Sequence, residues 1–210
     1  MPPGRIGYDL NADILLLHTI QTSTAVNQLL NTGELRAGPE HAASEWPEAY
    51  DWMYRMMAKR LPTFGTTALW LWARIRRYDL VNNCRRARNA EEPQALLTCR
   101  IPRERVLLPQ FDEWHAALNS TLAIRRRRGE TDEEFDTRFD EIADRFTTRL
   151  DAASARNAPI SHWPDEIRAE VERSWESIFV PANFDKRAYW QATVHEIRIE
   201  DVLDAVWILQ

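Results

Sequence analysis

The first clear pattern in the chain is a short apolar run at residues 14–17 that ends in a polar stretch at residues 18–21. Such a run is typical of a buried strand that delivers polar side chains at its C-terminal end. Hydroxyl residues at 22–24 suit the start of a helix, and Gly33 suits its end. The pattern therefore predicts a strand, a polar tip and a helix, after a loosely held lead-in over residues 1–12.

The following segments alternate between helical and strand patterns. Between Pro47 and Arg60, apolar residues recur at spacings of three and four, and the methionines among them are expected to fill the core. Shorter apolar runs predict strands. Strands are expected at residues 68–73, 95–101 and 106–108, helices at 111–119 and 165–178, a polar loop at Asn82 and Asn83, and a closing apolar run at 202–209.

The most informative stretch is a predicted strand over residues 188–199. With a period of two, Trp190, Ala192 and Val194 share one face, and Glu196 is the next residue on that face. An isolated buried carboxylate is costly, so Glu196 must be ionised and partnered, raised in pKa, or placed at the mouth of a cleft where something polar docks. The last alternative makes Glu196 a candidate functional residue.

Residues 125–160 differ in character from the rest of the chain. Four successive arginines at 125–128 and a glycine precede an acidic helix whose apolar stripe includes Phe135 and Phe146. Opposite charge blocks joined by glycine indicate a mobile insertion whose helix packs by one narrow face. We expect one domain over residues 1–210, with this insertion as a peripheral decoration.

Composition narrows the class of protein. Nine tryptophans and 44% hydrophobic residues favour a packed globular domain, and the net charge of −5 creates no global field that demands nucleic acid. No apolar run is long enough to span a bilayer, and residues 1–4 do not open a signal peptide, so we expect no membrane partner. Cys84 and Cys99 are expected to be free thiols in a reducing cytoplasm.

Arginine dominates the basic residues of the chain. All but two of the 27 basic residues are arginines, and residues 74–105 are rich in them. Because arginine pairs bidentately with phosphate, this stretch can hold a dinucleotide pyrophosphate or an RNA backbone. It can equally be a solvated surface, and the sequence leaves these alternatives open.

Several common chemistries lack their motifs. The chain has only six glycines and no glycine-rich phosphate loop, and no serine sits in a nucleophile elbow. The two cysteines lack a metal-ligand spacing, and the histidines form no zinc-binding pattern, so we expect no metal. The remaining candidates for a functional site are the polar residues at the end of the first strand and the glutamate on a late strand.

Seven blocks of the sequence resemble the bacterial family catalogued as domain of unknown function 3841. These blocks are residues 19–21, 49–53, 69–72, 106–108, 111–115, 174–179 and 191–193. The chain departs from the family pattern at residues 109–110, where a Ser-Asp pair is expected, and at residues 194–195, where an aromatic pair is expected. Little function is attached to this family, and the acidic insertion lies outside the part of the chain that resembles it.

The start of the chain is also similar to that of ADP-ribosyltransferase-like enzymes. The similarity consists of residues 17–19, the following helix, and residues 30–35. In that superfamily, a polar residue of the first strand holds the ribose and amide of NAD, and residues of a middle strand frame the nicotinamide ring. The resemblance implies that NAD is bound as a substrate by His18, Thr19, Gln21, Trp70 and Trp72.

The same resemblance assigns a role to Glu196. Loss of nicotinamide builds positive charge at the ribose anomeric carbon, and a preorganised carboxylate on a late strand stabilises that transition state. Glu196 would be this catalytic carboxylate. Because Val194 is neither Gln nor Glu, an arginine-modifying subtype is disfavoured.

The expected fold is α+β, with an ADP-ribosyltransferase-like split, mainly antiparallel sheet flanked by helices and a helical insertion. The expected function is an NAD-using enzyme that cleaves the nicotinamide–ribose bond and transfers ADP-ribose to an unidentified protein or nucleic acid. Two other functions stay open: a non-catalytic protein-interaction module, and an arginine-rich RNA or nucleotide binder. The RNA binder would lose affinity steeply with salt.

Overall fold

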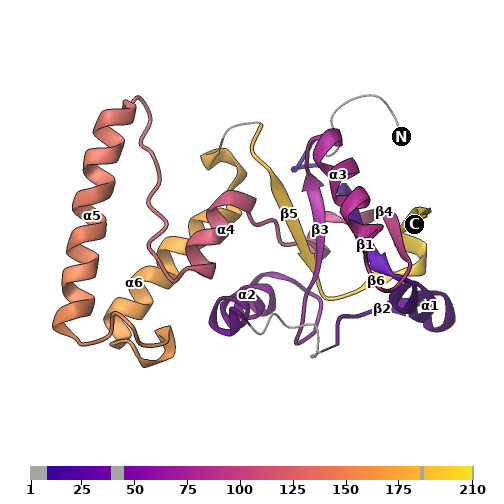
Figure 1. Ribbon diagram of the computed structural model, residues 1–210, viewed down its shortest axis with the longest axis horizontal. Helices are drawn as coiled ribbons and strands as arrows, with labels where there is room; N and C mark the ends of the chain where they lie inside the picture. Colours follow the sequence, from indigo (N-terminus) through magenta and orange to yellow (C-terminus); the bar gives the residue numbers. More distant parts are fainter. Residues whose placement is uncertain (1–8, 39–44, 185–186, 210) are drawn as a thin grey trace.

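The computed structural model describes residues 9–38, 45–184 and 187–209, and its strands form one five-stranded sheet and one two-stranded ladder (Figure 1). The strands of the sheet are β1 (Ile14–Thr22), β3 (Leu69–Arg74), β4 (Gln94–Pro102), β5 (Trp190–Val194) and β7 (Val202–Ile208). They lie in the order β5-β3-β1-β4-β7, and each neighbouring pair is antiparallel. The ladder pairs β2 (Glu34–Leu35) with β6 (Ile197–Arg198). The predicted α+β class with a mainly antiparallel sheet is confirmed.

The two faces of the sheet carry different side chains, because successive residues of a strand point to opposite faces. One face contributes Leu17, Leu71 and Ala192 to a buried cluster, and we call it the aliphatic face. The opposite face carries Trp70 and Trp72, and we call it the aromatic face. Helix α1 (Ser23–Thr32) packs on the aliphatic face, whereas α3 (Arg77–Ala87) covers part of the aromatic face.

Helix α1 begins and ends where its sequence predicts. The side chain of Thr22 accepts a hydrogen bond from the backbone N–H of Ala25 at 3.1 Å, which satisfies a donor at the helix start. Gly33 ends the helix with a φ of 80°, a backbone conformation that favours glycine. In the predicted lead-in, residues 1–8 lie outside the described ranges, but Leu10 is buried in the aliphatic cluster.

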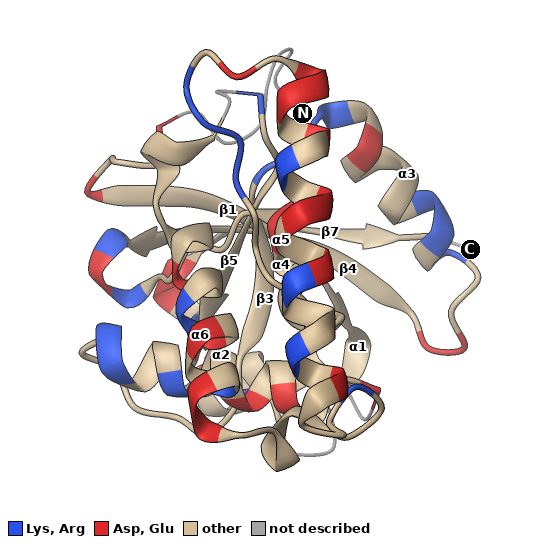
Figure 2. Cartoon of the chain, turned by 90° about the vertical axis from the view of Figure 1, so that its left-hand side faces the viewer, with Lys and Arg blue, Asp and Glu red and all other residues tan. Residues whose placement is uncertain are grey.

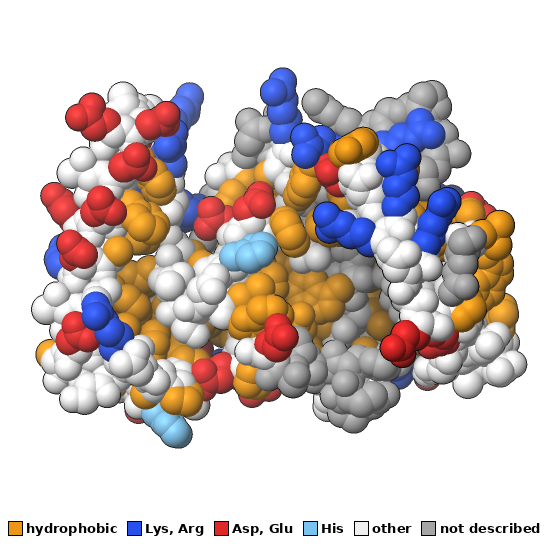
Figure 3. All heavy atoms as spheres, in the orientation of Figure 1, with side chains coloured by type: hydrophobic (Ala, Val, Ile, Leu, Met, Phe, Trp, Pro, Cys, Tyr) orange, Lys and Arg blue, Asp and Glu red, His pale blue; other side chains and the backbone are white. Residues whose placement is uncertain are grey.

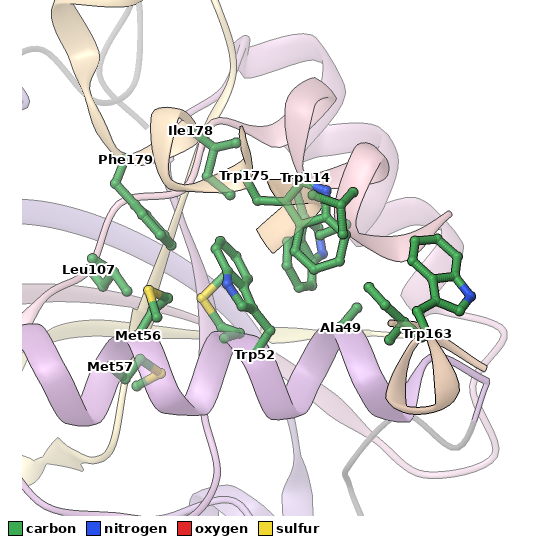
Figure 4. Close-up of a cluster of buried hydrophobic side chains, with 14 of the residues drawn as sticks. Ala49, Trp52, Met56, Met57, Leu107, Trp114, Trp163, Trp175, Ile178 and Phe179 are labelled. Carbon is green, nitrogen blue, oxygen red and sulfur yellow. The ribbon is translucent and has the colours of Figure 1, made fainter. Parts of the chain in front are cut away.

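Helix α2 (Pro47–Arg60) is the centre of a second core, built from helices. Its proline occupies the first turn, and its three methionines are buried, as predicted. Figure 4 shows Trp52 of α2 beneath Trp175 and Phe179, whose ring centroids lie 5.2 and 5.5 Å from that of Trp52. These contacts join α2 to α6 (Asp165–Trp175) and to the turn that follows α6.

The charged insertion forms the long helix α5 (Asp132–Ala152), which stands beyond α6 at one end of the molecule (Figure 1). Acidic residues line much of its length (Figure 2), and Thr131 and Glu134 cap its start reciprocally. Phe146 and Leu150 are buried in the helical core, whereas Phe139 is 40% exposed. The insertion therefore contributes its C-terminal end to the core and leaves its other end at the surface.

Three local predictions were wrong. Asn82 and Asn83 lie within α3 rather than in a loop, because Leu80 anchors one side of this polar helix to the sheet. Residues 106–108 form no strand, and Leu107 makes a single bridge to Thr193. The predicted strand 188–199 is interrupted after Val194, and its end turns away to pair with β2.

None of the helices in the described ranges combines the length and the apolar composition that a membrane span requires.

Candidate functional site

Four residues on four adjacent strands form a row across the sheet, which we call the polar row. His18 of β1 pairs with Trp72 of β3 on one side and with Thr98 of β4 on the other. Trp72 in turn pairs with Gln191 of β5. Residues that pair directly in an antiparallel ladder point to the same face, so Gln191, Trp72, His18 and Thr98 lie side by side on the aromatic face.

His18 has an unused nitrogen in this row. The side chain is only 7% exposed, and its Nδ1 lies 3.2 Å from the hydroxyl of Thr98. Its Nε2 is buried and has no hydrogen-bond partner among the described residues. Burial lowers the pKa of His18, so the imidazole is neutral near pH 7. An unsatisfied buried nitrogen costs about 1–3 kcal/mol, a cost that a ligand hydroxyl or amide would remove once the side chains over Nε2 move aside.

Trp70 and Trp72 form an aromatic floor beside His18. The ring of Trp70 packs against Tyr50 and Trp114, with centroid separations of 5.8 and 5.5 Å, and the ring of Trp72 lies 5.1 Å from that of Phe111. The indole N–H of Trp70 is buried and, within the described ranges, also lacks a partner. Two buried polar groups without partners therefore lie on the same face of neighbouring strands.

Apolar side chains are exposed on this side of the molecule. Figure 3 shows them between α4 (Phe111–Leu118) and α3, over the place where Figure 1 draws β3 and β5. Ile20, Trp70 and Trp72 on this face are each partly exposed. A flat aromatic ring can lie on such a floor with its polar atoms directed to the row.

Thr19 and Gln21 lie on the aliphatic face, away from His18. The hydroxyl of Thr19 donates to the carbonyl of Trp70 at 2.9 Å, and the amide of Gln21 donates to Thr19 at 2.8 Å. Both residues line a cavity of about 620 Å³, together with Arg36. The predicted cofactor-binding residues are therefore divided between the two faces of the sheet, since neighbours along a strand alternate in direction.

Glu196 lies outside the polar row. It follows the break after β5, five residues beyond Gln191 and so up to roughly 16 Å along an extended chain. Its side chain is buried, and its carboxylate is bound by the guanidinium groups of Arg36 and Arg198. The carboxylate of Glu196 is thus engaged by arginines, and within the described ranges it makes no hydrogen bond or ion pair with the residues of the polar row.

Glu196 instead belongs to a buried ion-pair network. Arg198 donates to its carboxylate at 2.6 and 2.7 Å, and the guanidinium of Arg105 lies 3.9 Å away. Arg105 also makes two hydrogen bonds of 2.9 Å to Asp201. Arg198 lies in β6 and Arg36 follows β2, whereas Arg105 ends the turn that follows β4, so the network ties the two-stranded ladder to the main sheet. This arrangement is the first of the alternatives expected for Glu196, an ionised and partnered acid.

Gln191 was missed as a site residue from the sequence. The sequence places Glu196 on the face of Trp190 and Ala192, and Gln191 on the opposite face of the predicted strand. The signal was the polar alternation of Gln191 and Thr193 on that opposite face.

The arginines of residues 74–105 do not act as one group. Arg105 is buried against Asp201, and Arg76 pairs with Asp79 at 2.7 Å. Arg85 and Arg88 lie on the exposed side of α3. The stretch is thus divided between a buried structural pair and a charged helix surface.

Cys84 and Cys99 are free thiols, and burial raises the pKa of Cys99 to about 12. Over the described ranges, no group of three or more metal-ligating side chains comes together.

The comparison with protein families matches residues 16–203 to the family described as Domain of unknown function (DUF3841). The matched range runs across the charged insertion, which the sequence resemblance had left outside. No curated protein and no solved structure is similar enough to this chain to match it.

Proposed function

Since the chain belongs to the family described as domain of unknown function 3841, whose description names no activity, we propose a function from the site itself. The protein is an ADP-ribosyltransferase-like protein that binds NAD with the nicotinamide riboside over the polar row. It transfers ADP-ribose from this site to a protein or nucleic acid.

The arrangement of His18, Trp72 and Gln191 on three adjacent strands carries this proposal. Neighbouring strands lie about 4.8 Å apart, so the three side chains span roughly 10 Å, close to the length of a nicotinamide riboside. The free Nε2 of His18 would bond a ribose hydroxyl, the indole of Trp72 would frame the nicotinamide ring, and the amide of Gln191 would bond the second ribose hydroxyl.

The transfer step breaks the bond between the ribose anomeric carbon and the nicotinamide nitrogen. The electron pair leaves with nicotinamide, and a nucleophile of the acceptor forms the new bond to the same carbon. Positive charge develops on the ribose in between. Gln191 can orient the sugar but carries no charge, and Glu196 is held by its arginines. We therefore expect NAD to bind well and to be cleaved slowly.

The neutral Gln191 also favours a second candidate, a non-catalytic module that binds NAD or a related nucleotide and signals to a protein partner. Both candidates require the same site. They differ only in whether nicotinamide is released from bound NAD, which chromatography of the reaction mixture measures directly.

Calorimetric titration with NAD tests the site. Wild type should bind, and His18→Ala should weaken binding by about tenfold, because one hydrogen bond to a buried partner is lost. His162→Ala, which removes an exposed histidine of the turn at residues 160–162, is the matched control and should leave the affinity unchanged. Nicotinamide mononucleotide should compete more strongly than AMP. Absence of any binding at about 5 mM NAD, or equal loss in both histidine variants, would refute the proposal.

A further inference from the structure

The strand β7 leaves an apolar edge of the sheet open. It pairs with β4 on one side, and no other described strand pairs with its outer edge. Leu203, Val206 and Trp207 are 54%, 52% and 47% exposed, and the strand contains one charged residue, Asp204. An exposed apolar edge without lysine or proline is a template for pairing with another strand.

The opposite edge of the sheet is covered, which makes the contrast informative. The segment around Leu107 lies along β5, with Leu107 and Thr193 exchanging hydrogen bonds of 3.1 and 2.8 Å, and Gln191 donates to the carbonyl of Pro109 at 3.1 Å. Among the described residues, the fold thus closes one edge with its own chain and leaves the backbone donors and acceptors of the other edge without a strand partner.

We infer that β7 docks against β7 of a second copy of this chain, in an antiparallel pair that joins the two sheets. The seven residues of β7 are centred on Ala205, so a two-fold axis there places Ala205 opposite itself and Asp204 opposite Val206 of the partner. The register of β7 with β4 shifts at Leu203, so the pairing rests on the regular run 204–208 around the small central Ala205. This inference is independent of the proposed NAD site.

The charges beside the strand agree with this register. Asp204 would lie opposite Val206 of the partner, on the face that carries α3, because Val206 pairs with Leu96 of that face. Val206 lines a cavity of about 370 Å³ together with Arg85 and Arg88 of α3. Each Asp204 therefore enters a groove that holds two arginines of the other copy, and the symmetry makes this contact twice.

Sedimentation velocity of the whole chain tests the pairing. Wild type should sediment with twice the 24.6 kDa mass of one chain at about 100 μM. Ala205→Arg, which puts two like charges opposite each other at the axis, should raise the dissociation constant at least about tenfold. Ala152→Arg introduces the same charge at an exposed alanine of α5 and should have no effect. A wild-type chain that stays single, or equal behaviour of the two variants, would overturn the inference.

A charge-reversal pair tests the register without relying on Ala205. Asp204→Arg alone, and Arg85→Asp combined with Arg88→Asp in another chain, should each weaken self-association. A mixture of these two variants should associate about as tightly as wild type, because every Arg–Asp contact is restored across the interface. A mixture no tighter than the variants alone would show that another surface holds the copies together. Circular dichroism of each variant verifies that it is folded.

Discussion

Replacement of Glu196 by glutamine should destabilise the protein. The carboxylate is 5% exposed and is bound by Arg36 and Arg198, whose side chains are 41% and 45% exposed. Solvent screening limits each of these pairs to about 0.5–1 kcal/mol. The new amide directs a donor toward a guanidinium donor, which costs about 1–2 kcal/mol more in a buried site. The sum predicts a loss of about 3 kcal/mol of unfolding free energy, or about 6–12 °C in Tm.

Urea denaturation followed by tryptophan fluorescence measures this loss. Glu200→Gln changes an exposed glutamate four residues away and should shift the unfolding free energy by less than about 0.5 kcal/mol. A structural Glu196 loses stability on substitution and keeps its NAD affinity. If Glu196→Gln were as stable as Glu200→Gln and yet abolished NAD cleavage, the carboxylate would be free for chemistry and the structural role would be refuted.

Three further outcomes follow from the site and its surroundings. Gln191→Glu should raise the rate of nicotinamide release about a hundredfold, since it places a carboxylate in the polar row, and an unchanged rate would exclude chemistry there. Burial lowers the pKa of His18, and burial together with the charge of Arg36 lowers the pKa of His195. Below about pH 6.5 the unfolded chain therefore binds more protons than the folded chain, and the unfolding free energy falls as the pH drops. Replacing both histidines with glutamine should reduce the dependence of the unfolding free energy on pH by at most about 1.4 kcal/mol per pH unit for each residue. Thermal unfolding at pH 7.5 and at pH 5.5 measures this change. Gly65→Ala should cost about 1–3 kcal/mol because its Cβ would lie 2.8 Å from the buried ring of His195. This cost should shrink in a His195→Ala background, which removes the ring and leaves only the contact of 3.0 Å with the Cβ of residue 195.

Much of the fold could be predicted because its signals are local. The cap at Thr22, the stop at Gly33 and the apolar stripe of α2 each reside in a few neighbouring residues, and the structure has all three. Helix α3 was missed because it is mostly polar and is held by one fully buried residue, Leu80, whose partners lie on distant strands. Propensity alone does not indicate such a helix, since its stability comes from tertiary packing.

The candidate site was harder to predict because it depends on register. His18 and Trp72 were expected in one site, and the structure pairs them directly across two strands. Thr19 was expected beside His18, although neighbours on a strand must point to opposite faces. Glu196 was displaced by the break after Val194, and its partner Arg36 is 160 positions away in the sequence. Strand order and register arise from such non-local pairings, so the sequence pattern did not contain them.

The state of the His18 ring tests the central claim most directly. Nitrogen-15 NMR of histidine-labelled protein, titrated with NAD to about 5 mM, follows each ring nitrogen separately. We predict that the Nε2 resonance of His18 shifts as it gains a hydrogen-bond partner, while the resonance of the exposed His162 stays in place. An unchanged His18 resonance under conditions where NAD binds would place the nucleotide elsewhere and contradict the proposed site.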